Sequence, residues 1–131
     1  MSIKTHKYLA VWQKAMTLAA NVYRLSKQLP RAEEYRMTSQ LLRAVVSIPA
    51  NIAEGHARGT RKDYANFISI ARGSTAELET LLLITRETGL LSQDGVDPLL
   101  ADCDEVGRML STLSSRLRET SSETYSLKPK T

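Results

Sequence analysis

Histidine and carboxylate side chains form many metal and catalytic sites, but their spacing in this sequence does not suit such a site. The only histidines are His6 and His56, and neither has a glutamate three residues before it. The Glu-x-x-His pairs of a di-iron helix bundle are therefore missing from the sequence. Glu54 precedes His56 by two residues, which places the two side chains on different faces of a helix. We expect neither a metal centre nor a bound cofactor.

Nucleophilic catalysis also finds little support in the sequence. The single cysteine, Cys103, falls on an apolar helical stripe, where a buried and unreactive thiol is the ordinary outcome. Serines are frequent, but none has a histidine and an acid at a recognisable spacing, and no glycine-rich phosphate loop occurs. Glu77 and Glu79 are two residues apart, so they point to different sides of a helix. We therefore expect a protein that is not an enzyme.

Positive charge is the remaining chemical signal. Residues 1–62 contain 11 Lys and Arg against 3 Asp and Glu, whereas residues 63–120 contain 5 against 10. A basic half of this kind fits a polyanion, and it fits equally well the acidic half of a neighbouring subunit. Solvated faces that merely differ in charge are the third interpretation.

The cations best placed to contact nucleic acid cluster at one predicted turn. These candidates are Arg58, Arg61 and Lys62 at the turn, with Arg36 and Arg43 earlier in the chain. Contacts between such cations and phosphate are independent of base sequence and weaken steeply with salt. Because aromatic residues make up only 5% of the chain, base stacking is a weak explanation. Structured RNA or duplex DNA therefore fits better than single strands.

Four helical segments must position these charges. In each segment apolar residues recur at steps of three and four, which is the periodicity of one helix face. The four stripes are Val11, Ala15, Leu18, Val22, Leu25 and Leu29; Met37, Leu41, Val45, Ile48 and Ile52; Tyr64, Phe67, Ile68, Ala71, Thr75, Leu78, Leu82 and Thr85; and Leu99, Cys103, Val106, Leu110, Leu113 and Leu117. No segment shows strand-like alternation. The sequence predicts an all-α fold, with short connections that make an up-and-down four-helix bundle.

Turn residues mark the expected helix ends. The first helix ends at Pro30, and the second runs over about residues 31–58. Gly59 suits the left-handed position that often follows a helix. Thr60–Asp63 is a capping-box pattern, with Asp in place of the usual Glu, that starts the third helix. Gly89 can end that helix.

The fourth helix has two candidate starts. Asp97 could cap it with Pro98 at the first helical position, or it could begin sooner, near Ser92. Beyond residue 120 the periodicity vanishes. We therefore expect a bundle domain over residues 1–120 and a disordered tail over residues 121–131.

Length and composition limit the chain to one ordinary domain. It has 131 residues, of which 42% are hydrophobic, so an aliphatic core within a single helix bundle is expected. One cysteine cannot form an intrachain disulfide, and the N-terminus lacks the apolar run of a signal peptide. No apolar run approaches the roughly 20 residues that span a bilayer. We expect a cytoplasmic protein without a membrane segment.

A proline stands inside the second predicted helix, in the stretch SIPANIAEG, Ser47–Gly55. Proline in a helix interior removes one donor and its ring meets the carbonyl four residues earlier, at a cost of about 3 kcal/mol. One solution is a break, with Ser47 capping a new helix and Pro49 in its first turn. The other solution, which we prefer, is a kink in one long helix.

Polar and small residues near this proline predict a tie between helices two and three. Asn51 and Glu54 lie three residues apart beside the core stripe, which suggests a buried hydrogen-bonded link to another helix. Arg72 is the expected partner of Glu54. Gly55 and Gly73 would let the two backbones approach closely. We expect this segment to serve structure rather than binding or catalysis.

Several motifs agree in order and spacing with one known family. They are Val11–Ala15, Thr38–Leu41 with Arg43 and Ala44, Ser47–Gly55, Ile70–Ser74 and Glu77–Thr80. Together they closely resemble the bacterial four-helix-bundle family that includes proteins encoded in intervening sequences of large-subunit ribosomal RNA genes. The resemblance covers roughly residues 7–117. Two departures occur: Arg36 and Met37 stand where Gly-Leu is usual, and Ala50 stands where Ser is common.

The resemblance implies a left-handed up-and-down bundle and assembly as a ring-like homopentamer. It also implies distant kinship with accessory proteins of diversity-generating retroelements, which associate with a reverse transcriptase and nucleic acid. The residues themselves favour oligomers too, because Leu81–Ile84 puts apolar groups all round the third helix. Trp12, Ala19 and Tyr23 add apolar surface to the first helix. A wide core stripe with scattered surface apolar residues is the alternative.

Two functions follow from these patterns. The first is a non-enzymatic, homo-oligomeric bundle that associates with structured RNA or duplex DNA through its basic surface. The alternative is a protein scaffold or adaptor whose ring binds a partner protein such as a polymerase. The two differ in their response to salt, because polyanion binding weakens steeply as salt rises whereas an apolar protein contact changes little.

Overall fold

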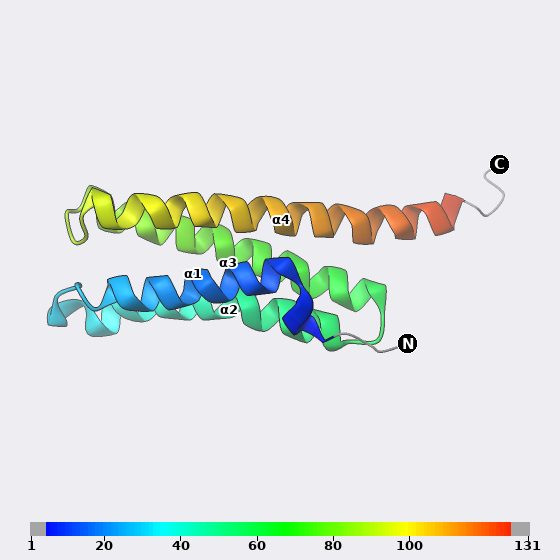
Figure 1. Ribbon diagram of the computed structural model, residues 1–131, viewed down its shortest axis with the longest axis horizontal. Coiled ribbons are helices and arrows are strands. Elements are labelled where there is room, and N and C mark those ends of the chain that lie inside the picture. Colours follow the sequence, from blue (N-terminus) through cyan, green and yellow to red (C-terminus); the bar gives the residue numbers. More distant parts are fainter. Residues whose placement is uncertain (1–4, 127–131) are drawn as a thin grey trace.

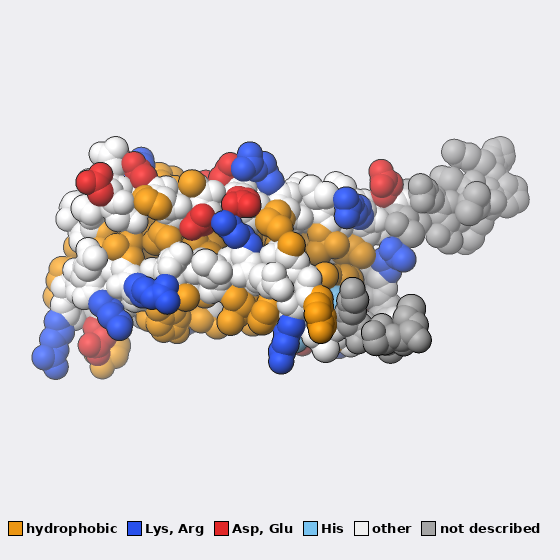
Figure 2. Space-filling model, in the orientation of Figure 1, with side chains coloured by type: hydrophobic (Ala, Val, Ile, Leu, Met, Phe, Trp, Pro, Cys, Tyr) orange, Lys and Arg blue, Asp and Glu red, His pale blue; other side chains and the backbone are white. Residues whose placement is uncertain are grey.

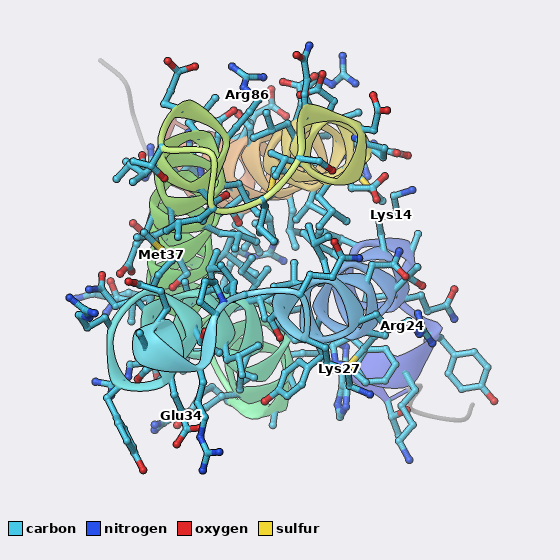
Figure 3. All side chains as sticks on the ribbon, turned by 90° about the vertical axis from the view of Figure 1, so that its left-hand side faces the viewer. Lys14, Arg24, Lys27, Glu34, Met37 and Arg86 are labelled. Carbon is cyan, nitrogen blue, oxygen red and sulfur yellow. The ribbon has the colours of Figure 1, made fainter. Side chains whose placement is uncertain are left out.

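The computed structural model describes residues 5–126, with side chains described for residues 5–119. Its four α-helices are α1 (Ala10–Ser26), α2 (Ser39–Ala57), α3 (Arg61–Glu87) and α4 (Gln93–Ser126). Consecutive helices run antiparallel (Figure 1), and α1 and α3 each pack against both α2 and α4. Viewed along their axes, the helices occupy four corners (Figure 3). The predicted all-α, up-and-down four-helix bundle is confirmed, and the described residues contain no strand.

Each of the predicted stripes supplies the core. The largest fully buried side chains are Leu18, Val22, Leu41, Val45, Ile48, Ile52, Ile68, Leu78, Leu82, Val96, Val106 and Leu110. Four stripe members lie half-buried at the margins of the core: Met37, Tyr64, Phe67 and Leu113. Aliphatic side chains thus fill the interior, as a chain poor in aromatic residues requires.

The second helix was predicted over about residues 31–58, but α2 begins only at Ser39. A 3₁₀ turn, η2 (Arg31–Glu33), is followed by a π-helical turn, η3 (Glu34–Thr38), before α2 begins. The Glu33 carboxylate accepts a hydrogen bond from the Met37 N–H at 3.4 Å. Arg36 donates to the Ala32 carbonyl at 3.1 Å and pairs with Glu33 at 3.5 Å. These local partners give the backbone an alternative to regular α-helical bonding.

The turn between α2 and α3 confirms one prediction and corrects another. Thr60 accepts a hydrogen bond from the Asp63 N–H at 3.1 Å, so it caps α3 as expected. The prediction that Gly59 is left-handed was wrong, since Gly89 (φ 75°) is the one glycine with positive φ among the described residues. The reason is that the chain leaves α2 in extended conformation at Arg58 and reaches the equally extended cap residue Thr60 without reversing its handedness.

The fourth helix takes the earlier of its two candidate starts. Ser92 accepts a hydrogen bond from the Gly95 N–H at 3.1 Å, and its carbonyl accepts from the Val96 N–H at 3.0 Å. Pro98 therefore lies inside α4. The α4 backbone is helical as far as Ser126, whereas the rest of the expected tail, residues 127–131, lies outside the described residues.

Helix α2 continues through Pro49, which excludes a break at Ser47. A bend at the proline and a left-handed bundle stay predictions. Asn51 donates from Nδ2 to the Ser47 carbonyl at 2.8 Å and to Ser47 Oγ at 2.9 Å. Ser47 Oγ in turn lies 2.7 Å from Ser74 Oγ on α3. The expected polar tie between the helices therefore exists, but two serines complete it.

The expected pair between Glu54 and Arg72 was wrong. Glu54 pairs instead with Arg58, the residue that follows the end of α2, at 3.0 Å, where both side chains are about half exposed. Arg72 lies on the side of α3 that faces α4, beside Gly107 and Arg108. Glu54 therefore pairs with a cation four residues later in the sequence and not with one on α3.

The two glycines of the proposed close approach behave differently. A Cβ added to Gly55 would lie 2.7 Å from Phe67 Cβ and 3.3 Å from the Tyr64 carbonyl, so α2 and α3 meet closely there as predicted. A Cβ added to Gly73 would have no heavy atom within 4 Å. The prediction for Gly73 was wrong, because this residue lies on the exposed side of α3.

Candidate nucleic-acid interface at the α2–α3 turn

Three cations surround the turn between α2 and α3, and we call Arg58, Arg61 and Lys62 the basic turn. All three side chains are exposed. Arg58 follows the last residue of α2, and the Thr60 cap places Arg61 and Lys62 in the first turn of α3. Two helix ends that are fixed by the cap and by the close contact at Gly55 thus hold the cations together.

Arg58 is held in position on two sides. Its Nη2 lies 3.0 Å from Glu54 Oε2, and its guanidinium carbon lies over the Phe67 ring, 4.9 Å from the centroid. The contact with the Phe67 ring and the ion pair with Glu54 each restrict the Arg58 side chain. Its side chain nevertheless remains 48% exposed. The guanidinium is therefore oriented and still open to a ligand.

Arg61 and Lys62 have no acidic partner at ion-pair distance within the described side chains. Lys14 contrasts with them, because it pairs across the α1–α4 contact with Glu105 at 3.0 Å and Asp102 at 3.6 Å. Those acids raise the pKa of Lys14, first through its hydrogen bond to Glu105. Arg61 and Lys62 are thus the two cations of the basic turn without an acidic partner among the described side chains.

An open pocket of about 440 Å³ lies against the basic turn. Its lining is His56, Arg58, Gly59, Thr60, Arg61, Tyr64 and Leu117. The rings of His56 and Tyr64 meet edge to face, with centroids 5.7 Å apart. Burial raises the pKa of the Tyr64 phenol. Apolar ring surface and positive charge therefore adjoin within one site.

The aromatic members of this site were missed from the sequence. His56 was considered only as a metal ligand, and Tyr64 and Phe67 only as members of an apolar stripe. The signal that could have found them is distance from the turn, because residues equally far before and after a short turn between antiparallel helices become neighbours. His56 and Tyr64 lie at nearly equal distances from Gly59 and Thr60.

The other two predicted cations are not part of this cluster. Arg36 belongs to η3 at the opposite end of α2, where Glu33 and the Ala32 carbonyl bind it. Arg43 is exposed in the second turn of α2, at least three helical turns from Arg58. The fold therefore brings together three of the five candidates and separates the rest.

Among the described residues, the cysteine thiol and the potential metal ligands form no second candidate site. Burial raises the pKa of the Cys103 thiol to about 12, with smaller effects from Glu79 and Asp102, so the thiolate nucleophile is suppressed. The described residues contain no cluster of three His, Cys, Asp or Glu side chains that could hold a metal ion. Within the same part of the chain, every helix is too short or too polar to cross a membrane.

A second surface feature is an apolar groove between α1 and α2. Its lining is Trp12, Met16, Ala19, Val46, Pro49, Ala50 and Ala53. Met16 and Val46 are each 44% exposed. Figure 2 shows hydrophobic side chains along the lower edge of the molecule, over these two helices. Pro49 and its neighbours on α2 line this apolar groove, and residues close to them in the sequence form the polar tie to α3.

Comparison with known proteins places the fold in a family. The family model of the 23S rRNA-intervening sequence protein matches residues 7–112. No curated protein matches the sequence. A crystal structure from Bacteroides thetaiotaomicron, of a protein of unknown function from the S23 ribosomal protein family, is 27% identical with a TM-score of 0.75. The alignment covers 80% of this chain and 98% of that one. With helices, motifs and family model in agreement, this chain belongs to the 23S rRNA-intervening sequence protein family.

Proposed function

We propose that this protein is a non-enzymatic, homo-oligomeric helix bundle that binds structured RNA or duplex DNA through the basic turn. The observation that carries the proposal is the exposed cluster in which Arg61 and Lys62 have no acidic partner among the described side chains. Such cations release counterions when they meet phosphate, which favours binding without base specificity.

Repulsion between the cations of the basic turn favours binding of an anionic ligand. Arg61 and Lys62 are adjacent like charges that repel each other, and neither takes part in the Thr60 cap or in the close contact at Gly55. Elsewhere the same residue types join helices, as Lys14 does with Glu105. A phosphate backbone would neutralise the repulsion.

The family supports the proposal only indirectly. Its name links its members to an intervening sequence of 23S rRNA, and the structural relative has no known function. The nucleic-acid role therefore rests on the surface of this chain. The absence of an activity in the proposal rests on the buried Cys103 thiol and on the lack, among the described residues, of a cluster of three His, Cys, Asp or Glu side chains.

Self-association is supported by exposed apolar surface. The α1–α2 groove is one patch, and Ile70 and Ile84 on α3 are 50% and 41% exposed. A second copy of the chain would remove these groups from water. A homopentamer, as the family resemblance implies, would repeat the basic turn around a ring and strengthen binding through multivalency.

The test is a salt titration of affinity for a fluorescently labelled structured RNA, with duplex DNA and heparin as comparison polyanions. We expect tight RNA binding that weakens with salt and exceeds heparin binding. Reversing Arg58, Arg61 and Lys62 to Glu should abolish RNA retention and leave the oligomer intact by light scattering. For duplex, the slope of log affinity against log salt should become shallower by roughly 0.9 for every phosphate that the protein no longer neutralises.

A matched control reverses three exposed cations at the other end of the bundle, Arg24, Lys27 and Arg31, and so changes the net charge equally. Arg24 and Lys27 lie at the C-terminal end of α1, which Figure 1 shows opposite the α2–α3 turn. The control variant should keep most of its RNA affinity. Equal reductions of affinity in the two variants would contradict a site at the basic turn and assign binding to overall charge.

A protein scaffold is the second candidate, and the apolar α1–α2 groove favours it. An apolar groove fits an amphipathic helix of a partner such as a polymerase. In that case the polyanions would bind weakly or equally, and binding of the partner protein would change little with salt. Replacing Val46 with Glu in the groove would then abolish partner binding, whereas reversing the basic turn would not.

A further inference from the structure

We infer that the basic turn recognises an unpaired nucleotide, with its base stacked on Arg58 and its phosphate beside Arg61 and Lys62. This inference rests on the proposed nucleic-acid function and narrows it. A fully paired duplex keeps its bases stacked inside the helix, so it could offer this site only phosphates. A bulge, loop or overhang offers a base as well.

Arg58 provides the stacking surface. Its guanidinium is planar, Phe67 supports one side of it at 4.9 Å, and Glu54 fixes it at 3.0 Å. Flat guanidinium groups stack on unstacked RNA bases much as aromatic rings do. Because both partners already restrict the side chain, little conformational entropy remains to be lost when a base arrives.

The open pocket that Arg58 helps to line has the chemistry of a nucleotide site. His56, Tyr64 and Leu117 provide ring and aliphatic surface for a base, while Arg61 provides positive charge. No acidic side chain is part of its lining. A ligand with a flat apolar part and an anionic part is therefore the best match.

The local concentration of rings changes the expectation drawn from composition. Aromatic residues make up 5% of the chain, which argued against stacking as a general mode of binding. Yet Phe67 lies under Arg58, and His56 and Tyr64 line the adjoining pocket. One base needs only one such site. The structure is therefore compatible with stacking of a single nucleotide while phosphate contacts hold the surrounding duplex.

The experiment compares two labelled RNA hairpins with the same stem and loop, one blunt and one with a single-nucleotide bulge, by fluorescence anisotropy at one salt concentration. The full-length protein should bind the bulged hairpin about 5- to 150-fold more tightly, which is the range for stacking one base. Arg58→Lys keeps the charge but loses the planar surface. It should lower affinity for the bulged hairpin much more than affinity for the blunt hairpin, so that the preference is lost.

Two further variants separate local from general effects. His56→Ala removes one wall of the pocket and should also reduce the preference for the bulged hairpin. Arg24→Lys makes the same chemical change at an exposed arginine at the other end of the bundle, and it should leave both affinities unchanged. Circular dichroism spectra that match the wild type establish that each variant is folded.

The outcomes distinguish this inference from the function on which it rests. Equal binding of the two hairpins by wild type, or a bulge preference that survives Arg58→Lys, overturns the inference and leaves phosphate binding by the basic turn intact. An equal loss of affinity for both hairpins in Arg58→Lys overturns it as well. In that case Arg58 contributes alike to the binding of both hairpins and does not stack on the unpaired base. Binding of neither hairpin by wild type overturns the proposed function itself.

Discussion

The two turns at opposite ends of α3 use positive charge in different ways. At the α3–α4 turn, Arg86 Nη1 lies 2.8 Å from Asp97 Oδ1, so the cation joins two helices, and Figure 3 shows it between them. At the α2–α3 turn, Arg61 and Lys62 meet no acid among the described side chains. One turn uses its arginine to join helices, and the other presents its cations to solvent.

The backbone explains why the basic turn is free to do this. The α2–α3 turn is held by the Thr60 cap and by the close approach at Gly55, neither of which involves a charged side chain from the cluster. The α3–α4 turn reverses through the left-handed Gly89 and adds an ion pair. Substitutions of Arg61 and Lys62 at the α2–α3 turn should therefore change binding without changing stability, whereas substitutions of Gly89 or Arg86 at the α3–α4 turn should change stability.

Gly55→Ala should have the largest effect on stability. The new Cβ would lie 2.7 Å from Phe67 Cβ, which cannot rotate away, so α2 and α3 must separate. Such overpacking costs about 1–3 kcal/mol of unfolding free energy, measured by denaturant titration. Gly73→Ala is the matched control, because its Cβ meets nothing and the helix gains about 0.5–1 kcal/mol. A Gly55→Ala protein as stable as wild type would refute the close contact that supports the basic turn.

Gly89→Ala should come next. An L-residue with a side chain at φ 75° is strained by roughly 1–2 kcal/mol, which glycine avoids. At the other turn, Gly59→Ala should be neutral or stabilising by up to about 1 kcal/mol, because Gly59 has negative φ and open space around it. Thermal or denaturant unfolding of the two variants decides the matter. Similar destabilisation of both would mean that the two turns reverse the chain alike.

The fold could be predicted because its determinants are periodic. Apolar steps of three and four place Leu18, Ile48, Ile68 and Leu110 in one core whatever the details of packing. Side-chain capping at Thr60 was also predictable, since it involves residues three apart. Local sequence therefore defined the helices and the start of α3.

The site was less predictable because it depends on how helices face one another. Arg72 lies on the α4 side of α3 and not on the α2 side, and periodicity alone does not decide between these sides. The left-handed conformation was wrongly assigned to Gly59. Glycine allows turns of either sign of φ, and the path of the chain between α2 and α3 selects one without positive φ. The cluster of Arg58, Phe67 and Tyr64 joins two helices across a turn, so no single helical stripe contains it.

Arg86→Ala and Arg61→Ala sharpen the comparison between the turns. Removal of Arg86 leaves Asp97 without its partner on α3, so the midpoint of thermal unfolding should fall measurably. Removal of Arg61 should leave that midpoint unchanged, because no acid loses a partner, while RNA affinity falls. A fall in midpoint for Arg61→Ala equal to that for Arg86→Ala would show that the basic turn is structural.

The smallest expected effect is a pH dependence confined to the α3–α4 turn. The hydrogen bond from Arg86 holds the pKa of the Asp97 carboxyl below its usual value. A depressed carboxyl pKa contributes stability that is present above the unfolded value, about 3.9, and is lost as pH falls through the folded value. The stability difference between wild type and Asp97→Asn should therefore be larger at pH 7 than at pH 3. Arg61→Ala, compared with wild type in the same way, should show no such trend. A difference for Asp97→Asn that stays constant with pH would mean that the ion pair does not stabilise the turn, and the contrast between the two turns would then rest on Gly89 alone.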